Sequence, residues 1–268
     1  MRATHRALEH AFRLSGTGPG RDLVERILET FREPMGGEPD AVYQLGVEGG
    51  QGVLRWDARE VFRGSASSAT SQLLTTINVA AIRSVDRYLV IHAAAVAFGG
   101  AGIVIPAHPG AGKSTLCSAL VADGFAYITD EAAPIIDSKE VIPYQKPIVV
   151  GRGSFETLAH VSFAALAEVD SEFWFLDPGM MMGGLVEGHV PIKFVVVPHY
   201  APDALLNVTR LTPGEIAAAL ASNAFNIGRH GRAGIETCAS IALEVVGVRI
   251  IHGGAMQAVA AISELVLQ

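Results

Sequence analysis

The stretch AHPGAGKST, residues 107–115, decides how this chain is interpreted. It follows the general phosphate-loop pattern of a small residue and four spacers before Gly-Lys-Ser/Thr, with Ala107 in place of the usual first glycine. A phosphate chain requires many backbone N–H groups that converge on one concavity. Gly110 and Gly112 allow this approach because they have no Cβ. The stretch therefore predicts a phosphate-binding loop.

The residues of the loop have separate expected roles. Lys113 places a point charge on the β and γ phosphates, and the Ser114 hydroxyl can bind Mg²⁺. The side chain of His108 is expected to point to solvent, so that only its N–H is used. ATP and Mg²⁺ are the expected ligands, and the predicted nucleotide-binding set is His108, Pro109, Gly110, Ala111, Gly112, Lys113, Ser114 and Thr115.

The sequence around the loop has the required order of strand, loop and helix. The apolar run GIVIPA before it can be a buried strand, and STLCSALVADG after it has a helical pattern with Gly124 as a natural stop. The N-terminus of such a helix adds its dipole to anion binding. Upstream, the long apolar segment 88–107 is broken by Gly99-Gly100, which favours two strands joined by a tight turn over a membrane helix.

An acidic pair ends the next apolar run. Residues 125–129 are strand-like and are followed by Asp130 and Glu131. A carboxylate at the end of a strand beside a phosphate loop can hold Mg²⁺ or orient the attacking group. Because neighbouring side chains on an extended chain point to opposite sides, one of the two must be the principal group, and Asp130 is favoured. Ser114, Asp130 and Glu131 are the candidate metal ligands.

His92 is a further candidate. A Gly99-Gly100 hairpin pairs Phe98 with Ala101 and places His92 opposite Ala107. There the imidazole could hold a charge or position a carboxylate beside the phosphates. The alternative is a partly buried histidine at the start of a strand. We predict Asp130, Lys113 and His92 as the catalytic group.

Composition narrows the class of protein. The chain has 268 residues, half of them apolar, and a net charge of −7, which argues against a nucleic-acid surface. Its two cysteines, Cys117 and Cys238, form no CxxC pair, as is typical of the reducing cytoplasm. We expect a cytoplasmic protein that binds neither nucleic acid nor membrane, and a homo-oligomer is left open.

The pattern along the chain predicts an α/β protein with a mixed sheet. Residues 1–87 read as a small α/β appendage, and residues 88–268 as the catalytic domain. In the appendage we expect helices over 22–31 and 67–88, with a strand, turn and strand over 41–64. In the second part we expect strands over 193–200 and 205–211 and helices over 213–225 and 255–267.

Residues 88–137 resemble the catalytic core of HPr kinase/phosphorylase, a bacterial serine kinase, and of its relatives. The resemblance is carried by His92, by the loop and by the pair Asp130-Glu131. It implies a P-loop kinase domain with a mixed sheet, similar to the C-terminal domain of HPr kinase and to phosphoenolpyruvate carboxykinase. It also implies transfer of the ATP γ-phosphate to a serine of a protein or peptide, with Asp130 accepting the proton.

The chain also departs from that family. HPr kinases have Asp-Asp where this chain has Asp130-Glu131, and no glycine-rich segment typical of the phosphorylase reaction is found downstream. We therefore expect the forward kinase reaction with little of the reverse one, and HPr is not singled out as the acceptor. Two alternatives remain, namely a kinase for a small-molecule hydroxyl and a non-enzymatic ATP-dependent switch or scaffold.

Three weaker candidates lie beyond the loop. Lys146 and Arg152 could stabilise the transferring phosphoryl group or bind an anionic acceptor, or they could be solvated loop charges. The segment FWFLDPGMMMGG, residues 173–184, could be a lid, although a core strand followed by a loop is favoured. The segment 226–234 reads as a glycine-rich loop from which Arg229 or Arg232, flanking His230, could reach the γ-phosphate.

Overall fold

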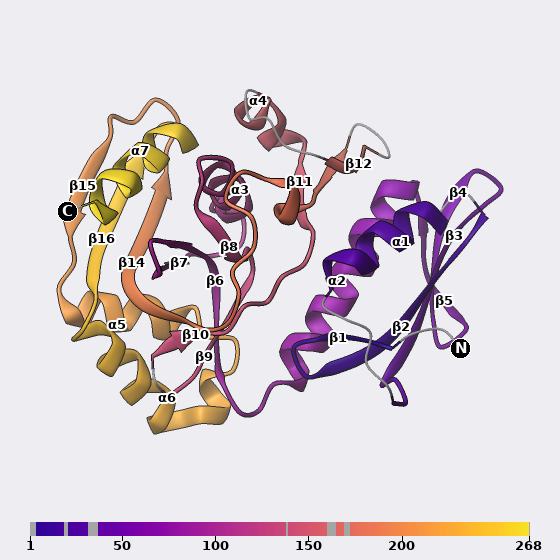
Figure 1. The fold of residues 1–268 in the computed structure, drawn as a ribbon, viewed down its shortest axis with the longest axis horizontal. Helices are drawn as coiled ribbons and strands as arrows, with labels where there is room; N and C mark the ends of the chain where they lie inside the picture. Colours follow the sequence, from indigo (N-terminus) through magenta and orange to yellow (C-terminus); the bar gives the residue numbers. More distant parts are fainter. Residues whose placement is uncertain are drawn as a thin grey trace. The chain divides into compact units, whose positions relative to one another are not determined.

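The computed structural model describes residues 4–18, 21–31, 37–137, 139–159, 165–168 and 172–267. They form a mixed α/β protein with three sheets, which confirms the predicted class (Figure 1). The chain divides into two compact units. The first comprises Met1–Val85, Gln145–Phe155 and Ala164–Asp177, and the second comprises Asp86–Tyr144, Glu156–Phe163 and Pro178–Gln268.

This division differs from the predicted break after residue 87. The chain leaves the first unit at Val85, but two later segments return to it. They supply the three-stranded sheet β11 (Ile148–Gly151), β13 (Phe173–Leu176) and β12 (Ala165–Glu168), in that order. Ser68 donates a hydrogen bond of 2.9 Å to Glu172, which ties the returning chain to the N-terminal region. These contacts join residues that are far apart in sequence, so no local sequence pattern predicts them.

The first unit is built on a five-stranded sheet with two helices. The strands follow one another in sequence order, and β2 and β3 are parallel while all other neighbours are antiparallel. The prediction of two strands over 41–64 was incomplete, because a second turn at Asp57 and Ala58 divides this stretch into three. The elements are β1 (His5–Ala7), β2 (His10–Thr17), α1 (Arg21–Thr30), β3 (Ala41–Glu48), β4 (Gln51–Trp56), β5 (Arg59–Gly64) and α2 (Ala66–Ser84).

Both helices pack on the sheet face that carries Phe12 and Leu45. Phe31, just after α1, meets Phe12 edge-on at 5.2 Å between ring centroids. A Cβ on Gly52 would lie 2.7 Å from the Ser65 carbonyl oxygen, so glycine lets α2 approach β4. The Ser65 hydroxyl accepts from the Ser68 N–H and caps α2, so the helix starts one residue before the predicted 67 and ends at Ser84, four residues before the predicted 88.

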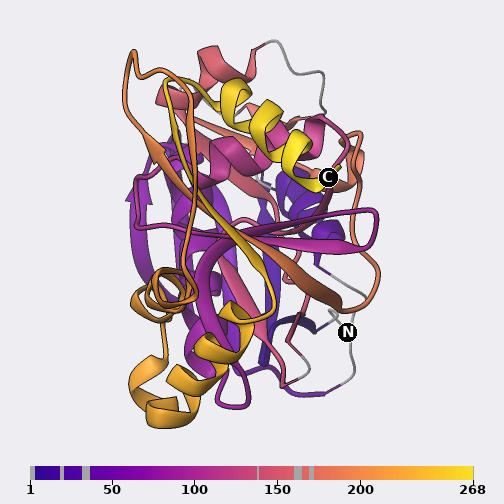
Figure 2. The ribbon, with the colours of Figure 1, turned by 90° about the vertical axis from the view of Figure 1, so that its left-hand side faces the viewer.

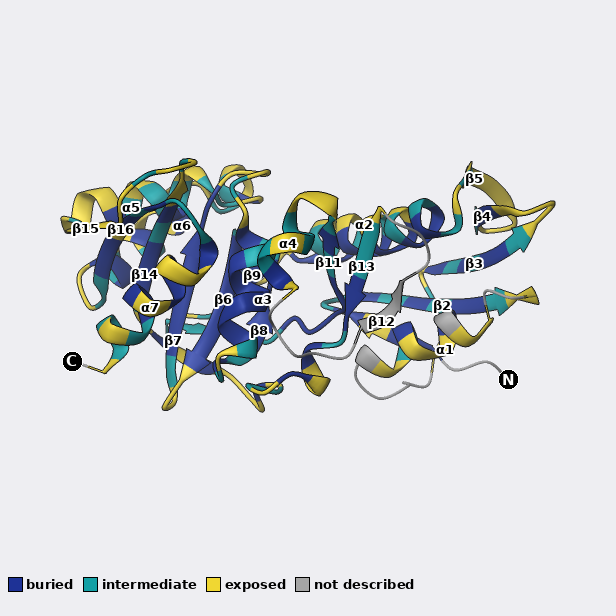
Figure 3. Cartoon of the chain, turned by 90° about the horizontal axis from the view of Figure 1, so that it is seen from above, coloured by how far each residue is buried: buried dark blue, intermediate teal, exposed yellow. Residues whose placement is uncertain are grey.

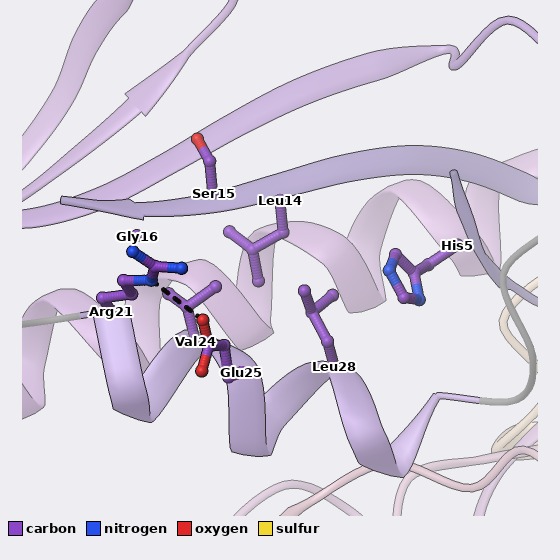
Figure 4. Close-up of a pocket in the computed structure, with 8 residues that line it drawn as sticks. All are labelled: His5, Leu14, Ser15, Gly16, Arg21, Val24, Glu25 and Leu28. Carbon is purple, nitrogen blue, oxygen red and sulfur yellow. Dashed lines mark hydrogen bonds and ion pairs between the residues drawn. The ribbon is translucent and has the colours of Figure 1, made fainter. Parts of the chain in front are cut away.

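A cavity of about 370 Å³ lies between α1 and β2 in this unit (Figure 4). Leu14, Val24 and Leu28 form its apolar walls, and the His5 ring lies at one end. The ion pair of Arg21 with Glu25 lies at the other end. The cavity contains none of the predicted site residues.

The second unit is built on an eight-stranded mixed sheet. Its order is β10, β9, β6, β7, β14, β16 and β15, with β8 also paired to β6. Because β10 pairs with β14 as well, the strands β10, β9, β6, β7 and β14 close into a ring. The strands are β6 (Leu89–Phe98), β7 (Ala101–Pro106), β8 (Ala126–Thr129), β9 (Ala132–Ile135), β10 (Glu140–Val141), β14 (Val190–Tyr200), β15 (Asn207–Arg210) and β16 (Val246–His252).

Helices cover the sheet of the second unit from both sides. Figure 2 shows α7 on one side of the strands and α5 and α6 on the other. Leu89, Ile91 and Ala93 of β6 belong to one buried apolar cluster with residues of α5 and α6. Figure 3 shows β6 as largely buried, whereas buried, intermediate and exposed residues follow one another along β14. The helices of this unit are α3 (Lys113–Ala122), α5 (Pro213–Ser222), α6 (Ile227–Ala242) and α7 (Ala255–Val266), with a short 3₁₀ turn at Pro178–Met180. The 3₁₀ turn at Arg152–Ser154 belongs to the first unit, and α4 (Phe155–Leu158) begins at the last residue of that segment.

The Gly99-Gly100 turn and its register are confirmed. Both glycines have positive φ, at 56° and 81°, and Phe98 pairs with Ala101. The apolar segment that contains them is therefore two strands. Within the described ranges, no helix has the length and apolar character needed to cross a membrane.

The prediction of a loop over 226–234 was wrong. These residues begin α6, and Gly231, with φ 53° and ψ −127°, marks a kink within it. A Cβ on Gly234 would lie 2.9 Å from the Ile227 side chain, so this glycine serves close packing. The favoured account of 173–184 is confirmed, since β13 is followed by a 3₁₀ turn and loop.

Candidate phosphate-binding site

The predicted loop joins the end of β7 to the start of α3. Gly110 and Gly112 have φ values of 81° and 80°, in the left-handed region that disfavours side chains. A Cβ at either position would meet no atom within 4 Å, so both glycines are required by backbone conformation. The loop therefore ends at a helix N-terminus, where free N–H groups favour an anion.

Lys113 is held by the loop itself. Its Nζ donates to the carbonyl oxygens of Ala107 at 2.6 Å and His108 at 3.1 Å. Burial lowers the pKa of Lys113, and the nearby carboxylates of Glu131 and Asp130 oppose that effect. To contact a phosphate, the ammonium group must exchange these carbonyl oxygens for phosphate oxygens.

Asp130 is buried beside the start of α3. The Ser114 hydroxyl donates to its Oδ2 at 3.0 Å, and the Tyr127 hydroxyl donates to its Oδ1 at 3.0 Å. The side chain of Tyr127 is fully buried, and Asp130 is 3% exposed. Each carboxylate oxygen therefore accepts from a different hydroxyl.

The sheet explains why Ser114 and Asp130 meet. Strands β7 and β8 are both antiparallel to β6, so their carboxyl ends lie at the same edge of the sheet. After β8, the Thr129 hydroxyl accepts from the N–H groups of Glu131 and Ala132, each at 3.3 Å, and shapes the turn. Cys117 of α3 contacts the Thr129 carbonyl oxygen at 3.7 Å, which fixes the helix against this strand end.

Glu131 is more exposed than Asp130. Its backbone carbonyl accepts from the Ala93 N–H at 3.1 Å, and its side chain is half-buried. The carboxylate raises the pKa of Tyr144 beyond the effect of burial and opposes the lowering of the pKa of Lys113. Glu131 thus contributes charge to this region, whereas Asp130 contacts Ser114 directly.

His92 lies one residue beyond the β6–β7 ladder, which ends at Ala93 and Pro106, and it pairs with Ala132 of β9. Its N–H donates to the Asn223 carbonyl oxygen at 2.7 Å, and its ring lies 4.9 Å from that of Phe225. Burial lowers the pKa of His92 to about 4, with further lowering by the positive charges of Lys113 and His108. The imidazole is therefore neutral at physiological pH, which favours a positioning role over a fixed positive charge.

The side chains around the loop offer oxygen ligands for Mg²⁺. Among the described residues, no three His, Cys, Asp or Glu side chains gather as metal ligands. However, Mg²⁺ binds through one or two carboxylates together with waters and substrate phosphates. The oxygens of Ser114 and Asp130, 3.0 Å apart, fit an ion that arrives with a nucleotide.

Comparisons with known proteins find only a distant structural likeness. No protein-family model matches it, and no curated protein sequence does. A search of solved structures returns the HPr(Ser) kinase/phosphatase from Coxiella burnetii, at 11% identity and a TM-score of 0.31. The match covers 66% of this chain and 97% of the other. A likeness at this level carries no information on activity.

The weaker candidates divide between the two units. Lys146 and Arg152 belong to the first unit, and Arg229 and Arg232 belong to the second, which also contains the loop and Asp130. Arg229 pairs with Asp86 at 2.7 Å, and Arg232 pairs with Glu236 at 2.7 Å. These arginines lie on a helix with carboxylate partners, which does not favour a reach to the γ-phosphate.

Tyr127 and Tyr144 were missed by the sequence analysis. Tyr127 donates to Asp130, and Tyr144 lies close enough to Glu131 and Asp130 for both carboxylates to raise its pKa. An isolated tyrosine in an apolar strand is typical of a protein core. The only available signal was the position of Tyr127, three residues before an aspartate that already had a candidate role.

Proposed function

We propose that this protein is an ATP-dependent kinase that transfers the γ-phosphate to a hydroxyl group. The observation that carries the proposal is the hydrogen bond from Ser114 to buried Asp130 at the start of α3. It joins a loop hydroxyl to a strand-end carboxylate whose charge also acts on Lys113, and phosphoryl transfer uses these three kinds of group.

In the proposed mechanism, the loop N–H groups and Lys113 bind the triphosphate. Mg²⁺, which Ser114 and the phosphate oxygens would hold with the acidic pair nearby, would neutralise charge on the phosphate oxygens. Asp130 accepts the proton of the acceptor hydroxyl, whose oxygen bonds to the γ-phosphorus as the bond to the β–γ bridging oxygen breaks. ADP leaves with that electron pair, and neutral His92 helps to position the reacting groups.

The favoured acceptor is a serine of a protein or peptide. This choice of acceptor is supported by the resemblance of residues 88–137 to serine kinases, because no motif in the sequence indicates which acceptor is used. A small-molecule hydroxyl is the alternative within the same chemistry. A non-enzymatic switch is disfavoured, because Lys113 and Asp130 are both present and lie at one site.

The experiment measures transfer of the labelled γ-phosphate of ATP to candidate acceptors, which are peptides and small molecules. Asp130→Asn keeps the shape of the side chain and removes its charge, and loss of a positioned base typically costs about 10²- to 10⁴-fold in rate. We expect turnover to fall by that order, with ATP affinity changed much less. Glu131→Gln is the matched control, because it makes the same chemical change one residue away.

Two results would count against the assignment. If Glu131→Gln abolishes turnover while Asp130→Asn stays active, the two carboxylates have been assigned the wrong way round. If both variants keep full turnover, the proposed mechanism is wrong.

A further inference from the structure

We propose that Tyr127 is a positioning residue that fixes Asp130 and leaves Oδ2 as the oxygen that reacts. This inference rests on the proposed function, because it assigns a role within that site. It starts from a buried phenol whose hydroxyl bonds to the candidate base, on the side of the carboxylate away from Ser114.

The Tyr127 hydroxyl is held in place as a donor to Asp130. The side chain is fully buried in β8, and its hydroxyl donates to Oδ1 of Asp130 at 3.0 Å. Because donor and acceptor lie three residues apart on one strand end, the bond does not depend on a distant element.

This bond distinguishes the two oxygens of Asp130. Oδ1 faces into the core and accepts from Tyr127, whereas Oδ2 faces the start of α3 and accepts from Ser114. A carboxylate held at one oxygen cannot rotate to offer the other. Tyr127 thus directs Oδ2 toward the bound phosphates and the acceptor hydroxyl. Without this bond, the carboxylate samples orientations that do not react.

Tyr144 provides a matched control in the same cluster. It is also buried, and its pKa is also raised by Glu131 and Asp130. However, its hydroxyl has no hydrogen-bond partner among the described residues. Tyr144→Phe therefore removes a buried hydroxyl near the same carboxylates without removing a bond to Asp130.

The experiment measures the steady-state hydrolysis of Mg·ATP, with water as acceptor, for the wild type, Tyr127→Phe and Tyr144→Phe. A hydrogen bond to a charged group is worth about 1.5–3 kcal/mol, which corresponds to roughly 10- to 150-fold in rate. For Tyr127→Phe we expect kcat to fall by about 10-fold or more with KM for ATP within about 2-fold. Tyr144→Phe should keep both constants. Thermal unfolding of all three proteins checks that they fold.

A second measurement needs no turnover. In a crystal structure of Tyr127→Phe, we expect the Asp130 carboxylate to be rotated away from its bond with Ser114, and in Tyr144→Phe that bond should be unchanged. If Tyr127→Phe keeps wild-type kcat, or if its Asp130 stays in place, the positioning role is overturned. If the wild type itself turns over no ATP with any acceptor, the proposed function fails, and the orientation of Asp130 still decides whether Tyr127 positions it.

Discussion

Replacing His92 by glutamine should make the protein less sensitive to acid. The ring is half-buried, and its pKa is lowered to about 4 from the ordinary 6.5, so it is neutral in the folded protein. As the pH falls below 6.5, the unfolded chain binds a proton at this residue while the folded protein does not. The free energy of unfolding therefore decreases as the pH falls from about 6.5 to about 4, and His92 costs nothing above that range.

The magnitude follows from the interval between the two pKa values. At about 1.4 kcal/mol for each pH unit, the interval corresponds to roughly 3 kcal/mol. The ring is only half-buried, so we reduce this to about 2 kcal/mol to allow for screening by solvent. Urea unfolding at pH 6.5 and pH 4 should thus show a smaller loss of stability for His92→Gln than for the wild type, by about that amount.

Other histidines do not obscure this difference. His5, His10 and His252 also have pKa values lowered by burial, but they titrate alike in both proteins and cancel in the comparison. His199→Gln serves as a control, because this histidine is exposed on β14. An equal loss of stability in the wild type and in His92→Gln would refute the claim that His92 is neutral in the folded protein.

Two further predictions concern the loop and the direction of reaction. Gly112→Ala and Gly99→Ala both place a Cβ at positive φ and should each cost roughly 1–2 kcal/mol of stability, but only Gly112→Ala should weaken Mg·ATP binding in calorimetry. Equal ATP affinities in the two variants would count against an essential loop conformation at Gly112. Incubation of the phosphorylated product with excess phosphate and Mg²⁺ should release little pyrophosphate, and efficient release would show that a phosphorylase segment was overlooked.

Features determined by neighbouring residues could be predicted from the sequence. The Gly99-Gly100 turn fixed the register of β6 and β7, and the glycines of the loop marked the start of α3. Asp130 was expected beside the phosphate loop because it ends the strand that follows the loop and its helix, and its Oδ2 accepts a hydrogen bond from Ser114. In each case a short pattern carries the geometry.

Features that depend on contacts between distant parts of the chain could not be predicted from the sequence. The return of β11, β12 and β13 to the first unit depends on pairing between segments far from α1 and α2. The glycines of α6 read as a loop, whereas one of them kinks a helix and another allows close packing. The bond from Tyr127 depends on the rotation of a buried ring, which no pattern of residue types encodes.

The most direct measurement of the central claim is the stabilisation of the protein by Mg·ATP. Binding to the folded state at 100 times Kd adds about 2.7 kcal/mol, which a thermal shift detects easily. Lys113→Ala should fold but lose this stabilisation, while Lys193→Ala, which removes an exposed lysine of β14, should keep it. If Lys113→Ala is stabilised by Mg·ATP as much as the wild type, residues 107–115 are not the phosphate-binding loop and the account fails.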